Sequence, residues 1–499
     1  MVKQSWQPPY HLGEKIGPKA DLGLILLTTT LVNFLDLFQL SAVLFGLPDI
    51  QRSLNFTTED INWVLIVYNI TFASFLLIGG QLGQRLGLER TFIIGTAILT
   101  VSNIINTAAP NKAALLAGRC ISGIGAGLTA PNGLAILSRK FADGEARNKA
   151  LAVYTACAPL GSTIGTVVGS LLASSPAGWR SIFWLCLILT AISTVLACLF
   201  LPEFSREKVP IDVLGASVFT AGIALLVYGL NDSSRLGWSA PSVLVGIILG
   251  ICLLLAFVIV EKRVANPAVP LYVWKSLPFF LMLVAIFAFG GSFSSWFFIT
   301  TQLCVNLLRY TPVLTAVCFL RNRQWRTLHP YGQIPRRKAT LVVGLVITAA
   351  GGVAWAFATP ERAGGTAHGQ GYWYSIVAAI IFVCGSPVAM VPAQSILLRQ
   401  VEAGNHAVAS ALFNTAYQVG ASVLLAGANA LINAKQENVN GIIRASMEGY
   451  RDAFWLLTGV LGGAALIVAV FYWPLRSETS ERTIEEALVE EHPTETKVH

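Results

Sequence analysis

The stretch GGQLGQRLGLERTFIIG, residues 79–95, forms a polar turn between two apolar segments. The segments that flank it, residues 62–83 and 91–109, each have close to the ~20 residues that a helix needs to cross the hydrocarbon core of a bilayer. Its glycines permit a tight turn, and Arg85 and Arg90 place positive charge at the membrane surface. The turn therefore predicts two membrane-spanning helices that are joined on the cytoplasmic side.

The composition of the whole chain agrees with this prediction. Of its 499 residues, 54% are hydrophobic and 12% are charged, which is too apolar and too poor in charge for an ordinary soluble protein. We therefore expect an all-α, polytopic membrane protein with thirteen clear spans. These spans are predicted at residues 22–46, 62–83, 91–109, 113–137, 150–173, 180–201, 213–230, 241–261, 279–303, 340–358, 372–393, 407–432 and 452–474.

Basic residues concentrate in alternate loops between the predicted spans, at residues 84–90, 139–149, 205–208 and 261–275. Because the cytoplasmic loops of membrane proteins are enriched in Lys and Arg, this alternation predicts a cytoplasmic N-terminus. It also accounts for the net charge of +8, so we expect no nucleic-acid partner.

Motifs of several other protein classes are absent from the sequence. The eight cysteines are scattered through apolar segments without metal-ligand spacing, so we expect no metal site. The sequence contains no phosphate-binding loop of the form GxxxxGK[ST], so ATP does not power the protein. It also contains no HExxH or GxSxG motif, so we expect no catalytic residues and no cofactor.

The alternation of the loops breaks between residues 304 and 338. The span at 279–303 runs outward and the basic run 321–338 belongs inside, yet only TPVLTAVCFL, residues 311–320, lies between them. This apolar stretch is far too short for a span. One interpretation is that the sequence has lost most of one helix here. The alternative is a re-entrant or interfacial segment that protein or a watery cavity covers.

Two ionisable side chains lie inside predicted spans, Asp36 in the first and Arg119 within LLAGRCISGIGAGLTAP, residues 115–131. Both are functional candidates because a charge inside a membrane is costly. The solvation of a buried carboxyl such as Asp36 and its distance from a cation would control its proton affinity. The alternatives are structural: Arg119 could tie helices together through an ion pair or a carbonyl contact, and hydroxyls or amides could satisfy Asp36.

Glycines recur at four-residue spacing in APLGSTIGTVVGS, residues 158–170, where they share one helix face and let another backbone approach closely. Other polar and aromatic side chains could line a cavity that binds a substrate, with interhelical hydrogen bonding, interfacial anchoring or packing as the alternatives. These candidates are Asn33, Gln39, Tyr68, Asn414 and Gln418, of which the last two share a helix face.

Taken together and in this order, residues 79–95, 115–131 and 158–170 resemble three motifs of the major facilitator superfamily. The motifs are its loop between spans two and three, its Arg-bearing fourth span and its Gly/Pro-rich fifth span. Further segments are similar to the fungal drug:proton antiporter family with fourteen spans, in its aminotriazole-resistance-like branch. They are FLDLFQLSAVLFGLPDI (34–50), NWVLIVYNITFASFLLIGG (62–80), WRSIFW (179–184), DVLGA (212–216), ALFNTAYQVGAS (411–422) and GYRDAFW (449–455).

This resemblance implies a major facilitator fold of two six-helix halves plus two extra spans, with Asp36 and Arg119 in proton coupling. The implied domains are a cytoplasmic tail (1–21), the first half (22–201), a linker with the two extra spans (202–265), the second half with one truncated span (266–475) and an acidic cytoplasmic tail (476–499). The implied conformational motifs comprise Gly80, Gln84, Arg85, Gly87, Arg90, Pro159, Gly161, Gly165 and Gly169. Gln84 departs from the family, which has Asp there, so a contact thought to hold the two halves in one conformation is weakened.

The sequence thus predicts a monomeric transporter in the plasma membrane, with the vacuolar membrane as the alternative. It would export amphipathic small molecules, such as drugs, toxic compounds or natural products, in exchange for protons by alternating access. Its partners would be the small-molecule substrate, protons and the lipid bilayer. The alternatives are an exporter of a specific small acid or anion and a non-transporting sensor or inactive paralogue. Transport predicts pH-dependent flux, whereas a sensor predicts ligand binding without flux.

Overall fold

In the computed structural model of the chain, helices account for nearly all of the described residues. The structure describes residues 18–57, 60–61, 63–141, 145–204, 212–264, 276–303, 337–357, 372–401, 406–439 and 442–472. Its helices are α2 (Pro18–Leu54), α3 (Trp63–Leu86), α4 (Leu88–Ala108), α5 (Lys112–Lys140), α6 (Glu145–Ala173), α7 (Arg180–Phe200), α8 (Val213–Leu236), α9 (Pro241–Glu261), α11 (Leu277–Gln302), α13 (Arg337–Ala356), α14 (Tyr372–Arg399), α15 (His406–Ala434), α16 (Met447–Ile467) and the π-helix η4 (Val468–Tyr472).

Each of the thirteen predicted spans coincides with one of these helices. By length and composition, twelve of them are able to cross a membrane, and α14 adds a shorter apolar stretch, Val388–Arg399. The fold class predicted from the sequence is therefore confirmed.

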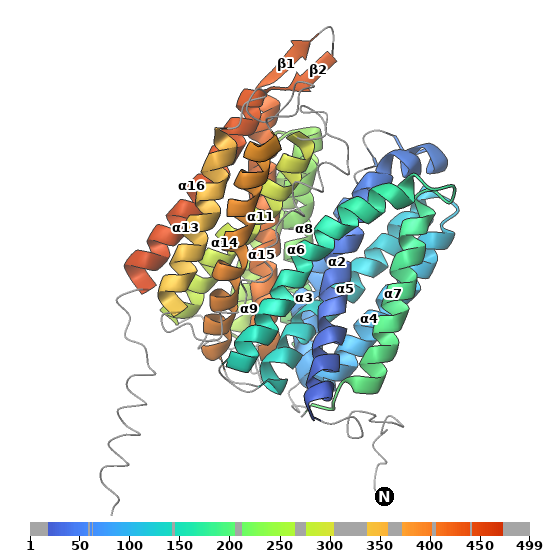
Figure 1. The fold of residues 1–499 in the computed structure, drawn as a ribbon, viewed down its shortest axis with the longest axis vertical. Coiled ribbons are helices and arrows are strands. Elements are labelled where there is room, and N and C mark those ends of the chain that lie inside the picture. Colours follow the sequence, from blue (N-terminus) through green and yellow to red (C-terminus); the bar gives the residue numbers. More distant parts are fainter. Residues whose placement is uncertain are drawn as a thin grey trace, which may run out of the picture.

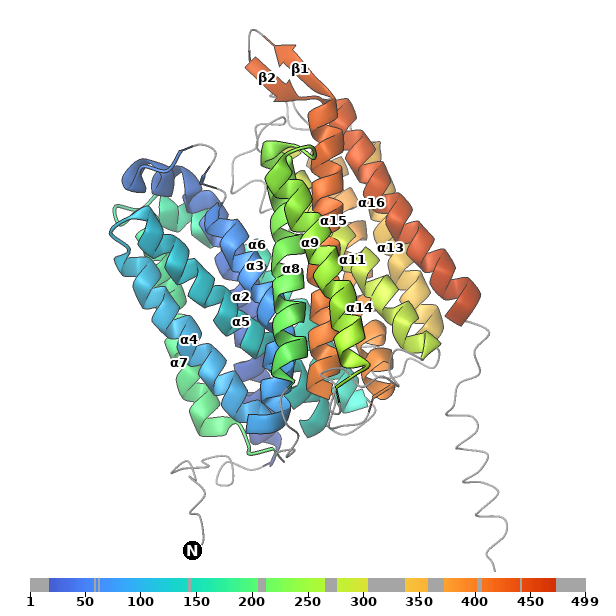
Figure 2. The same ribbon diagram turned by 180° about the vertical axis from the view of Figure 1, so that it is seen from behind.

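The helices form two bundles, and Figure 2 shows α8 and α9 running together over the region where the bundles meet. In the first bundle α2 packs against α6, α3 packs against α5, and α4 packs against α5 and α7. In the second bundle α11 packs against α15, and α13 packs against α14 and α16. The added helix α8 contacts α3 of the first bundle and α15 of the second, so it bridges them.

The two bundles repeat one packing pattern. The pair α13 and α14 corresponds to the pair α4 and α5, and α13 packs on α16 as α4 packs on α7. Since α13 is thus the counterpart of α4, none of the helices described in the second bundle is the counterpart of α3. The stretch TPVLTAVCFL and residues 321–336 lie outside the described residues, so the interpretation that a span is lost here stays a prediction.

Close approach of backbones holds α2 against α6. A Cβ atom on Gly161 or Gly165 would overlap the carbonyl oxygen of Phe34 or Phe38, and one on Gly169 would overlap the backbone of Ala42. This is the packing that the four-residue glycine spacing predicted. It brings the backbone of α6 against the same turns of α2 that carry Asp36.

One element was not predicted: a hairpin of two antiparallel strands, β1 (Gln436–Val439) and β2 (Ile442–Ala445), between α15 and α16. It lies at the end of the molecule opposite to the start of α2 (Figure 1). At its base the Lys435 ammonium contacts the carboxylates of Asp452 at 2.7 Å and Glu448 at 3.6 Å. The hydrogen bond to Asp452 raises the pKa of Lys435 above its ordinary value.

We expect that Gly165→Ala destabilises the protein, because the added Cβ would overlap the Phe38 carbonyl and force α2 and α6 apart. Overpacking of this kind costs about 1–3 kcal/mol. The matched control is Gly459→Ala on α16, where nothing lies within 4 Å of an added Cβ. Thermal unfolding of the purified proteins in detergent measures the effect. An equal unfolding temperature for the two variants would contradict the close approach of α2 and α6.

Candidate functional site

Asp36 lies near the middle of α2, where the neighbouring Leu35, Leu37 and Phe38 are all apolar. Its side chain is buried, with 8% of the residue exposed. Among the described residues its carboxyl group has no hydrogen-bond or ion-pair partner. A buried acid without a counter-ion is costly in its charged form, so this position suits a group that exchanges a proton.

Arg119 lies in α5 and is fully buried. Its Nε donates a hydrogen bond of 2.9 Å to the backbone carbonyl of Val64 on α3, and its guanidinium carbon lies 4.5 Å from the centre of the Tyr68 ring. Its two terminal nitrogens have no hydrogen-bond acceptor within the part of the chain that the structure describes. The cation is thus held by a carbonyl and an aromatic ring, and no carboxylate contacts it among those residues.

Tyr68 carries the aromatic ring that Arg119 contacts. It is 3% exposed, and its hydroxyl has no partner in the described ranges. The structure therefore brings together two residues that the sequence analysis singled out separately, Arg119 and Tyr68. The substrate-lining role of Tyr68 stays a prediction.

The candidate amides of α2 contact neighbouring helices. Asn33 Nδ2 donates to the carbonyl of Tyr154 at 2.7 Å, and Gln39 Nε2 donates to Asn103 Oδ1 at 2.9 Å. These are the interhelical hydrogen bonds that the sequence analysis gave as the alternative. Because a side chain can hold a neighbour and still border a cavity, a substrate-lining role for them stays a prediction.

The two candidates on α15 are partly exposed. Asn414 Nδ2 donates to the carbonyl of Ser410, one turn earlier in the same helix, at 2.8 Å. Gln418 lies one turn further along, as its spacing predicted. Among the described residues, no hydrogen bond joins Asn414 or Gln418 to Asp36, so their role also stays a prediction.

A buried polar network near Gln39 was missed by the sequence analysis. Ser122 on α5 donates to Ser102 on α4 at 2.8 Å, and Asn106 Nδ2 donates to Ser122 at 3.2 Å. Asn103, which accepts from Gln39, lies between Ser102 and Asn106 in the chain. The sequence did contain a signal for this network, because several polar residues lie inside the apolar segment that forms α4. This network links α2, α4 and α5 beside Arg119.

Among the described residues, three of the contacts between the two bundles lie in the halves of the helices nearest the start of α2. The Ser138 hydroxyl lies 3.1 Å from His406 Nδ1, and Thr155 donates to Gln394 Oε1 at 3.0 Å. A Cβ on Gly80 would lie 2.9 Å from the carbonyl oxygen of Ala407, so α3 and α15 approach closely there. The ribbons of the bundles diverge toward the hairpin end in both views (Figures 1 and 2).

The turn between α3 and α4 has the predicted glycine conformation, since Gly87 adopts a φ of 105°. Arg90 contacts Glu203 at 3.4 Å, and the Glu89 carboxylate accepts from the Phe204 backbone N–H at 3.1 Å. The turn is therefore tied to the segment after α7. Gln84 is partly buried and Arg85 is exposed at the end of α3.

Pro159 lies within α6, but its side chain is outside the described residues. The conformational roles of the glycines, Gln84, Arg85 and Pro159 stay predictions.

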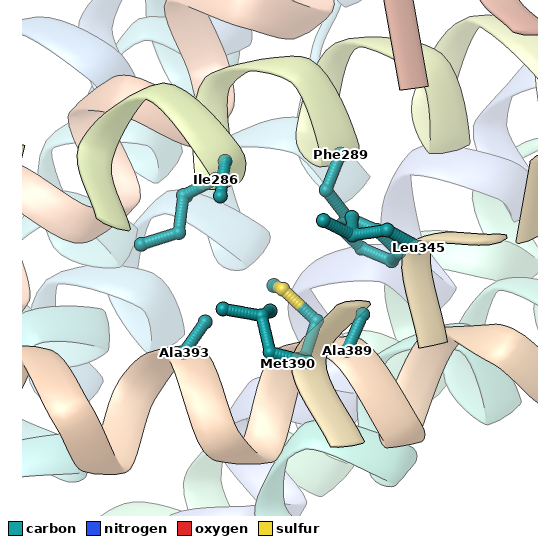
Figure 3. A pocket seen from close by; sticks show the side chains of 8 residues that line it. Ile286, Phe289, Leu345, Ala389, Met390 and Ala393 are labelled. Carbon is teal, nitrogen blue, oxygen red and sulfur yellow. The ribbon is translucent and has the colours of Figure 1, made fainter. Parts of the chain in front are cut away.

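A narrow apolar crevice lies between α11, α13 and α14 (Figure 3). Only apolar side chains border it: Ala285, Ile286, Phe289, Leu341, Leu345, Ala389, Met390 and Ala393. It offers no polar group for orienting a ligand, so we do not place a substrate there. Among the described residues, no group of three His, Cys, Asp or Glu side chains is arranged to hold a metal ion.

Comparison with known proteins agrees with this architecture. The model of the Major Facilitator Superfamily matches residues 29–320 and 331–496. The chain belongs to the Major Facilitator Superfamily, and its relatives indicate a transporter rather than an enzyme.

The chain is 66% identical over 493 residues to the "Major facilitator superfamily multidrug transporter mfsC" of Aspergillus fumigatus, covering 97% of this chain and 94% of the relative. It is 30% identical to the "Puromycin resistance protein pur8" of Streptomyces alboniger, covering 89% of this chain and 90% of the relative. The crystal structure of the human organic anion transporter MFSD10 has the same fold, with a TM-score of 0.58, 16% identity and coverage of 88% of this chain and 99% of that chain.

We expect that the double variant Ser138→Cys, His406→Cys forms a disulfide on mild oxidation, because these side chains face each other across the two bundles. The control pair is Ser138→Cys with Gly459→Cys, which places the second thiol in open space on α16. Mass spectrometry of the digested protein identifies the cross-linked peptides. A disulfide yield no higher in the first pair than in the control would contradict the contact between α5 and α15.

Proposed function

We propose that this chain exports amphipathic small molecules in exchange for protons, and that Asp36 is the group that carries the proton. The observation that supports this most directly is the buried Asp36 carboxyl, which has no counter-ion among the described residues. The first bundle also holds the fully buried Arg119, whose terminal nitrogens have no acceptor in the described ranges. The multidrug transporter and the antibiotic resistance protein among the relatives support a drug-like substrate. So does a third relative, the "Cephamycin export protein CmcT" of Amycolatopsis lactamdurans, at 29% identity.

The arrangement of the bundles supports alternating access. The bundles touch through Ser138, His406, Thr155 and Gln394 at the end where α2 begins, while their ribbons diverge at the hairpin end. The basic loops of the sequence support a cytoplasmic location for the start of α2. In this conformation a substrate between the bundles would therefore be closed off from the cytoplasm. Rocking of one bundle against the other would open that side and close the opposite one.

The charge of Asp36 provides the coupling in this proposal. A proton taken up on the outer side neutralises the carboxyl, which lowers the cost of its burial while the bundles move. Release of that proton to the cytoplasm restores a negative charge between the bundles, which favours binding of a cationic amphipathic substrate. The neutral acid carries the proton inward, and the ionised acid favours binding of the cationic substrate. The proton gradient therefore drives the substrate outward.

We further propose that the chain works as a monomer in the plasma membrane, with the vacuolar membrane as the alternative. A specific exporter of small acids is the second candidate, since the unpaired terminal nitrogens of Arg119 would suit a carboxylate. Arg119 is completely buried, whereas 8% of the buried Asp36 residue is still exposed, and this difference favours the cationic substrate.

We expect that Asp36→Asn keeps substrate binding and passive exchange but abolishes uphill export, because the amide has the same size and cannot release a proton. The measurement is efflux of a fluorescent amphipathic cation from vesicles, with and without an imposed pH gradient, at matched protein levels. The control is Asp452→Asn, which removes a carboxylate from the ion pair at the base of the hairpin. Undiminished uphill export by the Asp36 variant, with the same pH dependence, would show that Asp36 is structural.

A further inference from the structure

The two added helices, α8 and α9, form one tightly packed pair. A Cβ atom on Gly229 of α8 would lie 2.9 Å from the carbonyl oxygen of Val243 on α9. One on Gly250 of α9 would lie 3.0 Å from the carbonyl oxygen of Gly222 on α8. Glycines of both helices thus let the two backbones approach closely, and an interface of this kind has little room to slide. We therefore treat α8 and α9 as one unit.

The position of this unit is set by α8. Among the described elements α9 packs chiefly against α8, and many of its other side chains, such as Val245, Ile248 and Leu255, are exposed. In a bilayer these apolar side chains face lipid. The contacts of α8 with the two bundles therefore decide where the pair lies and with which bundle it moves.

Two directional contacts fix α8 on α3 of the first bundle. Thr220 Oγ1 donates a hydrogen bond of 3.0 Å to the backbone carbonyl of Ser74. The Tyr228 ring stacks on the Trp63 ring, with centroids 5.7 Å apart. These two contacts are separated by about 12 Å along α8, at a rise of about 1.5 Å per residue. Because α8 is held at two separated points, both its position and its direction along α3 are fixed.

The contact of α8 with α15 of the second bundle has a different character. Phe219 and Ile223 of α8 belong to a buried apolar cluster that also contains Ala411 and Leu412 of α15. Apolar contacts are non-directional, so they allow one helix to shift along another more readily than a hydrogen bond to a backbone carbonyl does. The hydrogen bond of Thr220 and the ring stack of Tyr228 both go to α3. The first bundle therefore holds α8 more firmly than the second.

The same helix covers the seam along which α3 and α15 meet. At the seam a Cβ atom on Gly80 of α3 would lie 3.1 Å from the Ala411 Cβ of α15. Helix α8 packs against both of these helices, and Figure 2 shows α8 and α9 running together over this region. On this side of the molecule, α8 and α9 thus lie between the seam and the surrounding lipid.

We propose that α8 and α9 move with the first bundle and shield one side of the space between the bundles from lipid, while α15 slides along α8. This inference rests on the alternating access of the proposed function. It gives the two added helices a role in transport. When the bundles rock apart, α8 still covers the seam, so an amphipathic substrate between the bundles does not escape into the bilayer on this side.

Distances between spin labels test whether α8 and α9 move with the first bundle. Three exposed positions at the hairpin end of the molecule are suitable: Ala113 at the start of α5, Ser239 between α8 and α9, and Ala434 at the end of α15. Each pair of positions is changed to Cys and labelled. Double electron–electron resonance in vesicles then measures the separation with and without a fluorescent amphipathic cation. The labelled wild-type protein gives the background from native cysteines.

We expect the cation to change the separation between positions 113 and 434, which lie in different bundles. The separation between 239 and 434 should change with it, and that between 239 and 113 should stay constant. A change between 239 and 113 would overturn the inference, because α8 and α9 would then move independently or with the second bundle. A constant separation between 113 and 434 would contradict the proposed alternating access itself.

A cross-link tests the same inference through transport. In the double variant Trp63→Cys, Tyr228→Cys, a short bifunctional thiol reagent joins α3 to α8 where their rings stack. We expect efflux of the fluorescent cation from vesicles at the rate measured before cross-linking, because α3 and α8 need not move apart. The matched control is Ser138→Cys, His406→Cys, in which the same reagent joins the two bundles and should abolish efflux. The treated wild-type protein corrects for reaction of native cysteines.

The two cross-links separate failure of the inference from failure of the proposed function. Loss of efflux in the cross-linked Trp63→Cys, Tyr228→Cys variant would overturn the inference, because α8 would then have to move relative to the first bundle. Undiminished efflux in the cross-linked Ser138→Cys, His406→Cys variant would instead overturn alternating access between these bundles.

Discussion

The contact between Arg119 and α3 is the constraint on which the account of this protein depends. A buried guanidinium must find partners, and here they are the Val64 carbonyl and the Tyr68 ring. Two glycines of α5 make this possible, since a Cβ on Gly123 or Gly127 would collide with Tyr68, Phe72 or Phe75 of α3. Arg119 is thus held by neutral groups, and Asp36 on α2 is a buried acid without an ion pair among the described residues.

Each bundle contains a pair of helices that pack closely through glycines. Gly161 and Gly165 let α6 approach α2, and Gly420 lets α15 approach the Phe287 carbonyl of α11 in the corresponding pair. Interfaces of this kind have little room to slide or expand, so each bundle is expected to move as a unit. The contacts of Ser138 with His406 and of Thr155 with Gln394 are single hydrogen bonds between bundles. In the proposed alternating-access cycle, these are contacts that would break when the bundles part at this end.

The positions of the spanning helices could be predicted from the sequence. A hydrophobic run long enough to cross a bilayer must be helical, because its backbone groups have no water to bind. The sequence also predicted the close approach at Gly165, since glycines four residues apart share a helix face. The sequence could not predict that Gln39 contacts Asn103 or that Ser138 contacts His406. These pairs depend on the rotation of helices distant in the chain, which hydropathy does not specify. The contact of the Arg119 guanidinium with the Tyr68 ring depends on helix packing in the same way.

The central claim is that substrate and proton compete through the charge of Asp36. Proton release on substrate binding tests it most directly. A fluorescent amphipathic cation is added to the purified protein in a weakly buffered detergent solution, and the pH of the solution is recorded. The account predicts that binding of the cation acidifies the solution with the wild-type protein, and that the Asp36→Asn variant binds the cation without releasing a proton. Equal proton release from the two proteins, or binding to the wild-type protein with no release at any pH, would contradict it.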